Sequence, residues 1–155
     1  QFFYFSQDTF TPFIDGLIKK TKTTAMRAFM QTQIPVLKQN IDESFRRQVY
    51  FGGTEKPWAD LRPYTKTKRM LNGTWYGEAN STLKENFKMF NRIKAGGSVG
   101  KDATGAFYAR LQTSDDIALQ HQAGIPGKMA ARPPYSLLAE TQVKLVTNAV
   151  KFIMS

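Results

Sequence analysis

"MRAFMQTQIPVLKQNIDESF", residues 26–45, is the longest periodic stretch in the chain. Apolar residues recur in it every three or four positions, which is the spacing of one face of an α-helix. They are Met26, Phe29, Met30, Ile34, Leu37, Ile41 and Phe45. Polar and charged side chains occupy the other positions, so the pattern predicts a long helix whose apolar face forms the core. Pro35 lies inside this helix and removes one backbone hydrogen bond, so we expect a kink there.

Shorter patterns at the two ends of the chain flank this helix. Residues 2–6 (FFYFS) are rich in aromatic side chains and predict a short strand. Residues 11–18 follow with apolar side chains at helical spacing and predict a first short helix. Near the other end, an apolar stripe predicts a C-terminal amphipathic helix. The stripe comprises Leu138, Val146, Ala149, Val150 and Ile153, with Leu145 and Phe152 beside them.

Turn residues and alternating patterns divide the middle of the chain. Gly52 and Gly53 end the long helix and begin a loop, which leads into a short basic helix from about Pro63. Apolar residues at 83, 87, 89 and 93 predict a strand. Residues 96–105 predict a hairpin connection from this strand to an antiparallel partner in residues 105–113 (GAFYARLQT).

A short helix is predicted over residues 115–122, with Thr113 or Ser114 as its cap and Gly124 as its stop. Together these elements predict a single α+β domain over residues 1–155. In it, a small and mostly antiparallel sheet packs against the long kinked helix and the C-terminal helix.

The composition limits the partners of this domain. The chain has 155 residues, is 41% hydrophobic and contains no cysteine, which excludes disulfides and thiol chemistry. No apolar run approaches the roughly 20 residues of a membrane-spanning helix, so we expect no membrane partner. The net charge of +10 favours nucleic acid or an acidic protein as the partner, although the basic residues are spread along the chain.

The residue types that carry catalysis are sparse. His121 is the only histidine, and Ser114 and Asp115, the nearest members of a possible triad, are expected at a helix start. A phosphate-binding loop over residues 95–102 would need glycine in place of Ala95 and serine or threonine in place of Asp102. We therefore expect no enzyme activity, no cofactor and no metal, and interpret His121 as a residue that bonds a loop carbonyl.

The densest basic patch is "RPYTKTKR", residues 62–69, in which Tyr64 lies among the charges. Such a patch suits contact with a nucleic acid backbone or with an acidic protein, and it also suits a solvated helix face. The candidate contact residues are Arg62, Lys66, Lys68 and Arg69.

The stretch "HQAGIPGKMAARPPYSL", residues 121–137, separates two helical segments. Three of the seven prolines lie in it, so it is neither a helix nor a central strand along its length. Stiffened irregular segments of this kind usually serve a site or a contact surface. We therefore predict a protruding loop over residues 122–136.

Two stretches together resemble the phage virion-morphogenesis family, the tail-completion proteins of contractile-tailed phages. Residues 45–69 (FRRQVYFGGTEKPWADLRPYTKTKR) are similar to that family's long helix, glycine-bearing loop, "PW-x-x-L" element and basic helix. Residues 121–124 are similar to its "HQ-x-G" element. Residues 130–133 (AARP) resemble its "P-A-R-P" element, which precedes a C-terminal helix.

The resemblance implies a structural protein of the virion neck, which joins head to tail as a ring of identical subunits, hexameric by family analogy. The partners it implies are other neck proteins, the portal or its adaptor, the tail terminator or tube, and packaged DNA. In such a ring each subunit's loop docks on a different patch of the next subunit. The interface residues it implies, with a position in the core as the alternative for Trp58, are Trp58, Arg132, Pro133, Pro134 and Tyr135. The alternative function is that of a basic nucleic-acid-binding protein.

Overall fold

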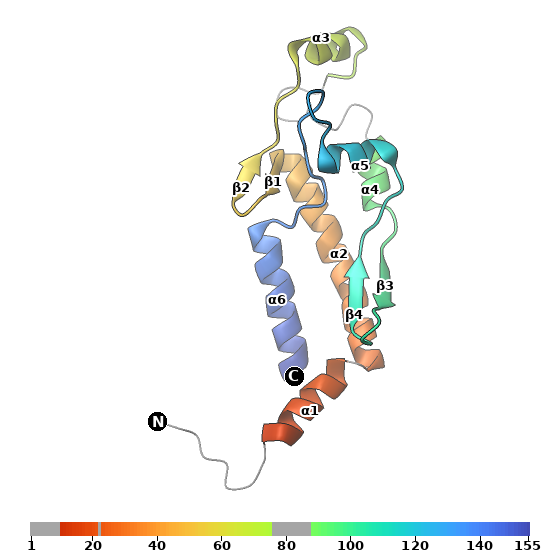
Figure 1. The fold of residues 1–155 in the computed structure, drawn as a ribbon, viewed down its shortest axis with the longest axis vertical. Coiled ribbons are helices and arrows are strands. Elements are labelled where there is room, and N and C mark those ends of the chain that lie inside the picture. The colour runs from red at the N-terminus through yellow and green to blue at the C-terminus, as the bar shows by residue number, and fades with distance from the viewer. Residues whose placement is uncertain (1–9, 22, 76–87) are drawn as a thin grey trace.

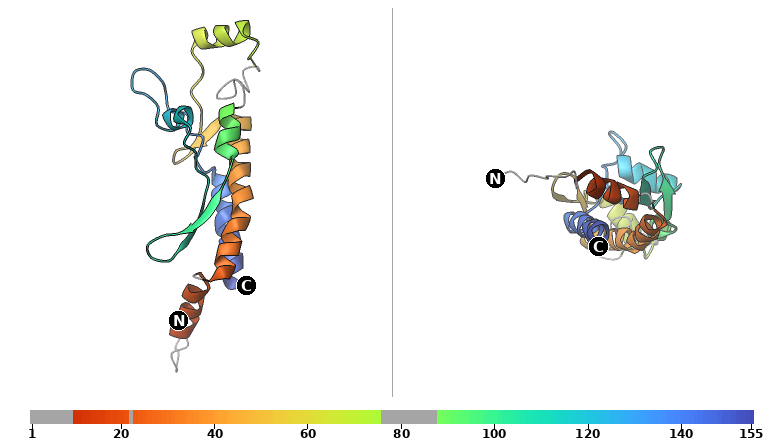
Figure 2. Two further views of the ribbon diagram at one scale, coloured as in Figure 1. Left: turned by 90° about the vertical axis from the view of Figure 1, so that its right-hand side faces the viewer. Right: turned by 90° about the horizontal axis from the view of Figure 1, so that it is seen from below.

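The computed structural model describes residues 10–21, 23–75 and 88–155, and shows an elongated α+β molecule (Figures 1 and 2). The strand expected in residues 2–6 lies outside the described residues. No helix within the described ranges is long and apolar enough to cross a membrane. In chain order the elements are α1 (Phe10–Thr21), α2 (Thr24–Arg47), β1 (Val49–Phe51), β2 (Glu55–Pro57), α3 (Pro63–Leu71), α4 (Lys88–Lys94), β3 (Ser98–Lys101), β4 (Phe107–Arg110), α5 (Asp116–Ala123) and α6 (Ala139–Met154).

The long helix α2 is the axis of the molecule (Figure 1). It contains Pro35 and ends at Arg47. The next residue, Gln48, caps the helix: it has a left-handed conformation with φ of 55° and donates its backbone N–H to the Ser44 carbonyl. Helix α6 lies along one side of α2, and the β3–β4 hairpin lies along another. Helix α3 stands at one end of the molecule and α1 at the other. The predicted long helix is confirmed.

The main hydrophobic cluster lies near the C-terminal end of α2. Phe45 and Ile41 of α2 are almost completely buried there. The Phe45 ring meets Trp58 edge-on at 4.9 Å and Phe90 at 4.7 Å between ring centroids. Ile93 of α4 is fully buried in the same cluster. The residues after α2 and those of α4 are therefore held on one end of the long helix.

Two antiparallel hairpins make up the observed sheets. In the first, β1 pairs with β2 with Tyr50 opposite Lys56, whereas a loop was predicted from Gly52 onward. In the second, β3 pairs with β4 with Val99 opposite Ala109. Strand β4 lies in the stretch predicted as a strand over residues 105–113, whereas β3 lies inside the stretch predicted as the hairpin connection, so the predicted partner strand is wrong. Gly97 has φ of 121°, and a Cβ there would lie 2.5 Å from Ile34, so this hairpin packs closely on α2.

The strand predicted over residues 83–93 is wrong in its described part, because residues 88–94 form helix α4. Met89, Phe90 and Ile93 all pack into the main cluster. Their spacing of one and then three residues suits a helix, and Phe90 is out of phase with the predicted alternation. The first part of the predicted strand, which includes Leu83 and Phe87, lies outside the described residues.

Helix α6 is confirmed, but it packs on α2 through a different face from the one predicted. Phe152 stacks on Phe29 with ring centroids 4.6 Å apart, and Asn148 donates to Gln33 at 3.0 Å. Val146 and Val150, predicted to belong to the buried stripe, are instead exposed. The polar Asn148–Gln33 bond and the ring stack fix the rotation of α6, and that rotation points both valines outward.

Candidate functional site

The loop predicted over residues 122–136 begins at Gly124, because residues 122 and 123 belong to α5. It folds back on itself beside the segment that leads to α3 (Figures 1 and 2). Ile125 bridges Met129 in antiparallel fashion, and the Ile125 N–H donates to the Met129 carbonyl at 2.8 Å. Gly124 has φ of 74°, and a Cβ there would lie 2.8 Å from the backbone nitrogen of Ala131. Only glycine suits such an approach of two backbones. The loop is therefore a closed turn with a fixed base.

Arg132 holds the base of this loop. Its guanidinium donates through Nε to the Ala59 carbonyl at 2.7 Å and through Nη2 to the Asp60 carbonyl at 2.8 Å. The side chain is 7% exposed, and burial lowers its pKa. These two donors of Arg132 are therefore used within its own chain, and a role of Arg132 at a subunit contact stays a prediction. The irregular segment at residues 59–60 has carbonyl groups that need donors, and Arg132 supplies them within its own chain.

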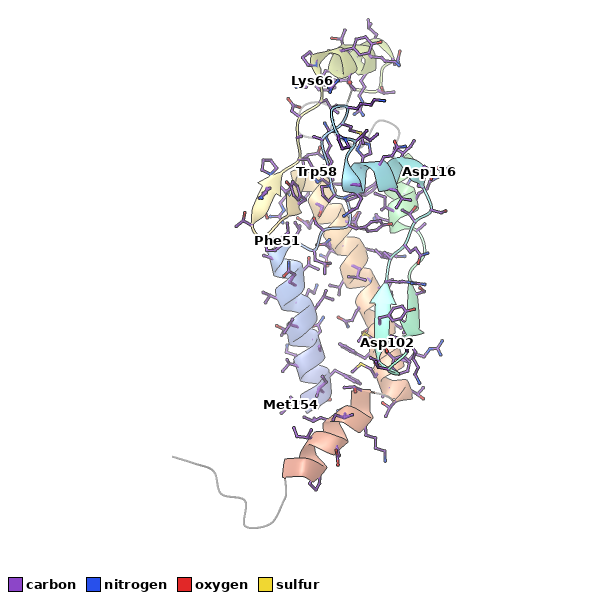
Figure 3. The ribbon with its side chains drawn as sticks, viewed as in Figure 1. Phe51, Trp58, Lys66, Asp102, Asp116 and Met154 are labelled. Carbon is purple, nitrogen blue, oxygen red and sulfur yellow. The ribbon has the colours of Figure 1, made fainter. Side chains whose placement is uncertain are left out.

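The other predicted interface residues are also partly or fully buried. Trp58 is buried beside Phe45, which corresponds to the core alternative, and Figure 3 places it at the upper end of α2. Pro134 is fully buried, whereas Pro133 and Tyr135 are half-buried. Burial raises the pKa of Tyr135 to about 12. None of these residues is therefore exposed on the surface of the single chain.

His121 lies in the last turn of α5. Its backbone carbonyl accepts a hydrogen bond from the Arg132 N–H at 2.8 Å, so the carbonyl rather than the ring forms the loop bond. The ring nitrogen Nδ1 is buried and has no hydrogen-bond partner among the described residues. Burial, followed by the positive charges of Arg132 and Arg69, lowers the pKa of His121 to about 4. The ring is therefore neutral at pH 7.

This shift predicts a loss of stability in mild acid. Between pH 6.5 and about 4 the unfolded chain binds a proton at His121 that the folded chain does not, so the free energy of unfolding falls as the pH falls. A whole proton would give about 1.4 kcal/mol per pH unit, and the half-buried ring gives a fraction of that. Urea titrations of the wild type and His121→Gln from pH 7 to 4.5 measure the difference. Equal pH slopes in the two proteins would contradict this prediction.

The charged side chains of the basic patch at residues 62–69 make different contacts. Arg62 donates to the Lys128 carbonyl at 2.9 Å, and Lys66 binds Asp60 at 2.8 Å. The hydrogen bond from Lys66 is the main cause that holds the pKa of Asp60 below its usual range. Arg69 is buried, which leaves Lys68 exposed on α3. The four residues therefore do not form one open cationic face.

A cleft of about 570 Å³ opens between α4 and the start of α5. Asp115 lies in its wall, accepts the N–H of Ala118 at 3.1 Å and forms an ion pair with Arg92. Asp115, rather than Thr113 or Ser114, is therefore the cap of α5. Its carboxylate is engaged by the cap and by Arg92, and the hydrogen bond from Arg92 is the main cause that lowers its pKa. Within the described ranges no three histidine, aspartate or glutamate side chains cluster in a way that could hold a metal ion.

Two exposed apolar surfaces were not predicted from the sequence. The tip surface on α3 comprises Tyr64, Met70 and Leu71, and Tyr64 and Leu71 are 77% and 82% exposed. The seam on α6 comprises Val143, Val146, Val150 and Met154, which are 54% to 66% exposed. Met154 lies at the lower end of α6, and α3 with Lys66 lies at the opposite end of the molecule (Figure 3). The signal for the seam was present, because its residues follow helical spacing.

No family model, curated protein or solved structure matches this chain. The resemblance to phage tail-completion proteins is limited to the short sequence elements in residues 45–69 and 121–133 and stays a prediction.

Proposed function

We propose that this chain is a structural subunit that associates with copies of itself, and that it serves as a ring at the neck of a phage particle between head and tail. The main observation in support of the proposal is that more large hydrophobic side chains are exposed than hydrophobic side chains are buried. Eight hydrophobic residues are buried among those described, whereas eleven large hydrophobic residues are exposed. A monomer with so thin a core gains stability when its exposed apolar surface is covered by a partner.

The neck as the setting, the hexameric state, and the portal, adaptor, terminator and tube as partners come from the sequence resemblance. The net charge of +10 suits acidic neighbours in such an assembly or DNA in its channel. The proposal includes no enzymatic step and no cofactor. The alternative of a nucleic-acid-binding protein has less support, because Lys66 is paired with Asp60 and Arg69 is buried.

Electron microscopy tests this function. We expect the purified chain, mixed with phage tails that lack it, to form rings or to add density at the tail ends. Replacing Tyr64 and Leu71 with glutamate on the tip surface serves as a comparison. Both side chains are exposed, so we expect the fold of the monomer to be retained. Absence of rings and of tail-end density, together with DNA affinity that falls steeply with salt, would favour the alternative instead.

A further inference from the structure

A groove of about 390 Å³ lies between the β3–β4 hairpin and the first turn of α2. We call it the hairpin groove, and its lining residues are Thr24, Arg27, Val99, Gly100, Lys101 and Phe107. The turn of the hairpin, which contains Asp102, stands away from α2 near the start of that helix (Figures 2 and 3). Arg27 and Lys101 are the charged residues of the groove, and both are exposed. The hairpin groove therefore carries two positive charges on one concave surface.

Neither of these charges is neutralised by a carboxylate of the described residues. The Arg27 side chain forms no hydrogen bond or ion pair within the described ranges. The Lys101 ammonium lies over the Phe107 ring at 4.7 Å from its centroid, and an aromatic ring leaves the positive charge in place. The carboxylate of Asp102 is held in the turn, where Oδ1 accepts the Thr104 N–H at 2.8 Å. The first turn of α2 contains no acidic residue, so both cations are available to an anion from outside the chain.

The hairpin groove differs in this respect from the basic patch at residues 62–69. In that patch Lys66 is paired with Asp60 and Arg69 is buried. Arg27 and Lys101 lie far apart in the sequence and share one surface because the hairpin packs on α2. Such a pair leaves no cluster of charge in the sequence. The hairpin groove is thus the better candidate for contact with an anionic partner.

The hairpin carries a cation on each of its faces. Phe107 and Tyr108 are neighbours in β4, so their side chains point to opposite faces of the hairpin. Lys101 lies over Phe107, whereas Arg110 lies over Tyr108 at 5.3 Å from the ring centroid. A two-stranded ribbon fits the major groove of B-DNA. There the cations on its two faces can reach the phosphates of different strands, an arrangement that an acidic peptide does not offer.

We propose that the β3–β4 hairpin enters the major groove of duplex DNA, and that phosphates of one strand lie in the hairpin groove against Arg27 and Lys101. Arg110 then faces the phosphates of the other strand. The net charge of +10 attracts such a polyanion at long range. Because the contacts are to phosphates, the binding depends little on base sequence. One chain suffices for this contact, so the inference goes beyond the proposed function, and either one can fail without the other.

Fluorescence anisotropy with a labelled DNA duplex of mixed sequence, at several salt concentrations, tests this inference. The wild type is expected to bind with an affinity that falls steeply with salt. Arg27→Gln combined with Lys101→Gln is expected to lower the affinity roughly tenfold at low salt and to reduce the slope of log affinity against log salt by about two. Lys68→Gln combined with Lys128→Gln removes the same charge from two exposed side chains elsewhere and is expected to keep the slope of the wild type.

Further variants make the test specific. Arg27→Lys combined with Lys101→Arg retains both charges and is expected to retain the slope. The double glutamine variant at Arg27 and Lys101 is expected to form the same assemblies as the wild type in electron microscopy, so a loss of DNA affinity is distinguishable from a loss of assembly. Circular dichroism checks that this variant is folded. If it is not, Lys101→Gln alone changes one exposed side chain and is expected to reduce the slope by about one.

Several results would overturn the inference. No binding to duplex DNA even at low salt would show that the hairpin groove does not take phosphates. An equal reduction of the slope in the Lys68 and Lys128 control would show that net charge alone attracts DNA. Binding to polyglutamate as tight as to DNA would show a site for an acidic protein. Binding to duplex RNA as tight as to DNA would show that the hairpin does not enter the duplex, because the major groove of RNA is deep and narrow.

Discussion

Phe45→Ala is expected to lower the free energy of unfolding by about 3–5 kcal/mol. The Phe45 side chain is completely buried and joins Trp58 to Phe90 by ring contacts at 4.9 and 4.7 Å. Its removal leaves a cavity that the rigid end of α2 cannot close. Because few hydrophobic residues are buried in this molecule, the loss is a large fraction of its total stability.

Urea unfolding followed by circular dichroism measures this effect, with Tyr64→Ala as the control. Tyr64 is an aromatic residue on the exposed tip surface, so its removal is expected to change the stability of the monomer by less than about 0.5 kcal/mol. Phe45→Leu retains most of the buried apolar volume and is expected to fall between the two. A loss below about 1 kcal/mol in Phe45→Ala would show that the main cluster is elsewhere.

Arg132→Ala is the second large change and is expected to cost about 2–4 kcal/mol. The variant loses two charged hydrogen bonds and leaves the carbonyl groups of Ala59 and Asp60 without their donor. The loop at residues 122–136 then loses its link to the segment before α3. We expect faster proteolysis within this loop in addition to the lower free energy of unfolding.

Two variants make this test specific. Arg132→Lys keeps the charge but lacks the planar fork that reaches two carbonyl groups, so we expect an intermediate loss. Lys128→Ala changes an exposed side chain in the same loop and is expected to leave stability unchanged. If Arg132→Ala unfolds like the wild type and yet fails to assemble, Arg132 acts at a subunit contact, as the sequence resemblance implied.

Local patterns in the sequence predicted much of the fold. The long apolar period identified α2, Pro63 marked the start of α3, and Gly124 marked the end of α5. These signals act over one or two turns of chain and need no distant partner. The β1–β2 hairpin was missed because its strands have three residues each, too few to show alternation.

The surfaces of the molecule were harder to predict, because they depend on how elements pack. The prolines around Arg132 indicate a stiff backbone but not the direction of the side chain, which is set by the carbonyl groups of Ala59 and Asp60. Helix α6 carries apolar residues on two faces. The face that is buried is decided by Phe29 and Gln33 on α2, more than a hundred residues away.

Sedimentation velocity of the purified chain, over a hundredfold range of concentration, tests the central claim most directly. The claim is that the apolar surface outside the thin core is covered by other copies of the same chain. We predict a mass that rises from 17.6 kDa to at least twice that value as the concentration increases. A mass of 17.6 kDa at every concentration, both alone and with phage tails present, would contradict the claim.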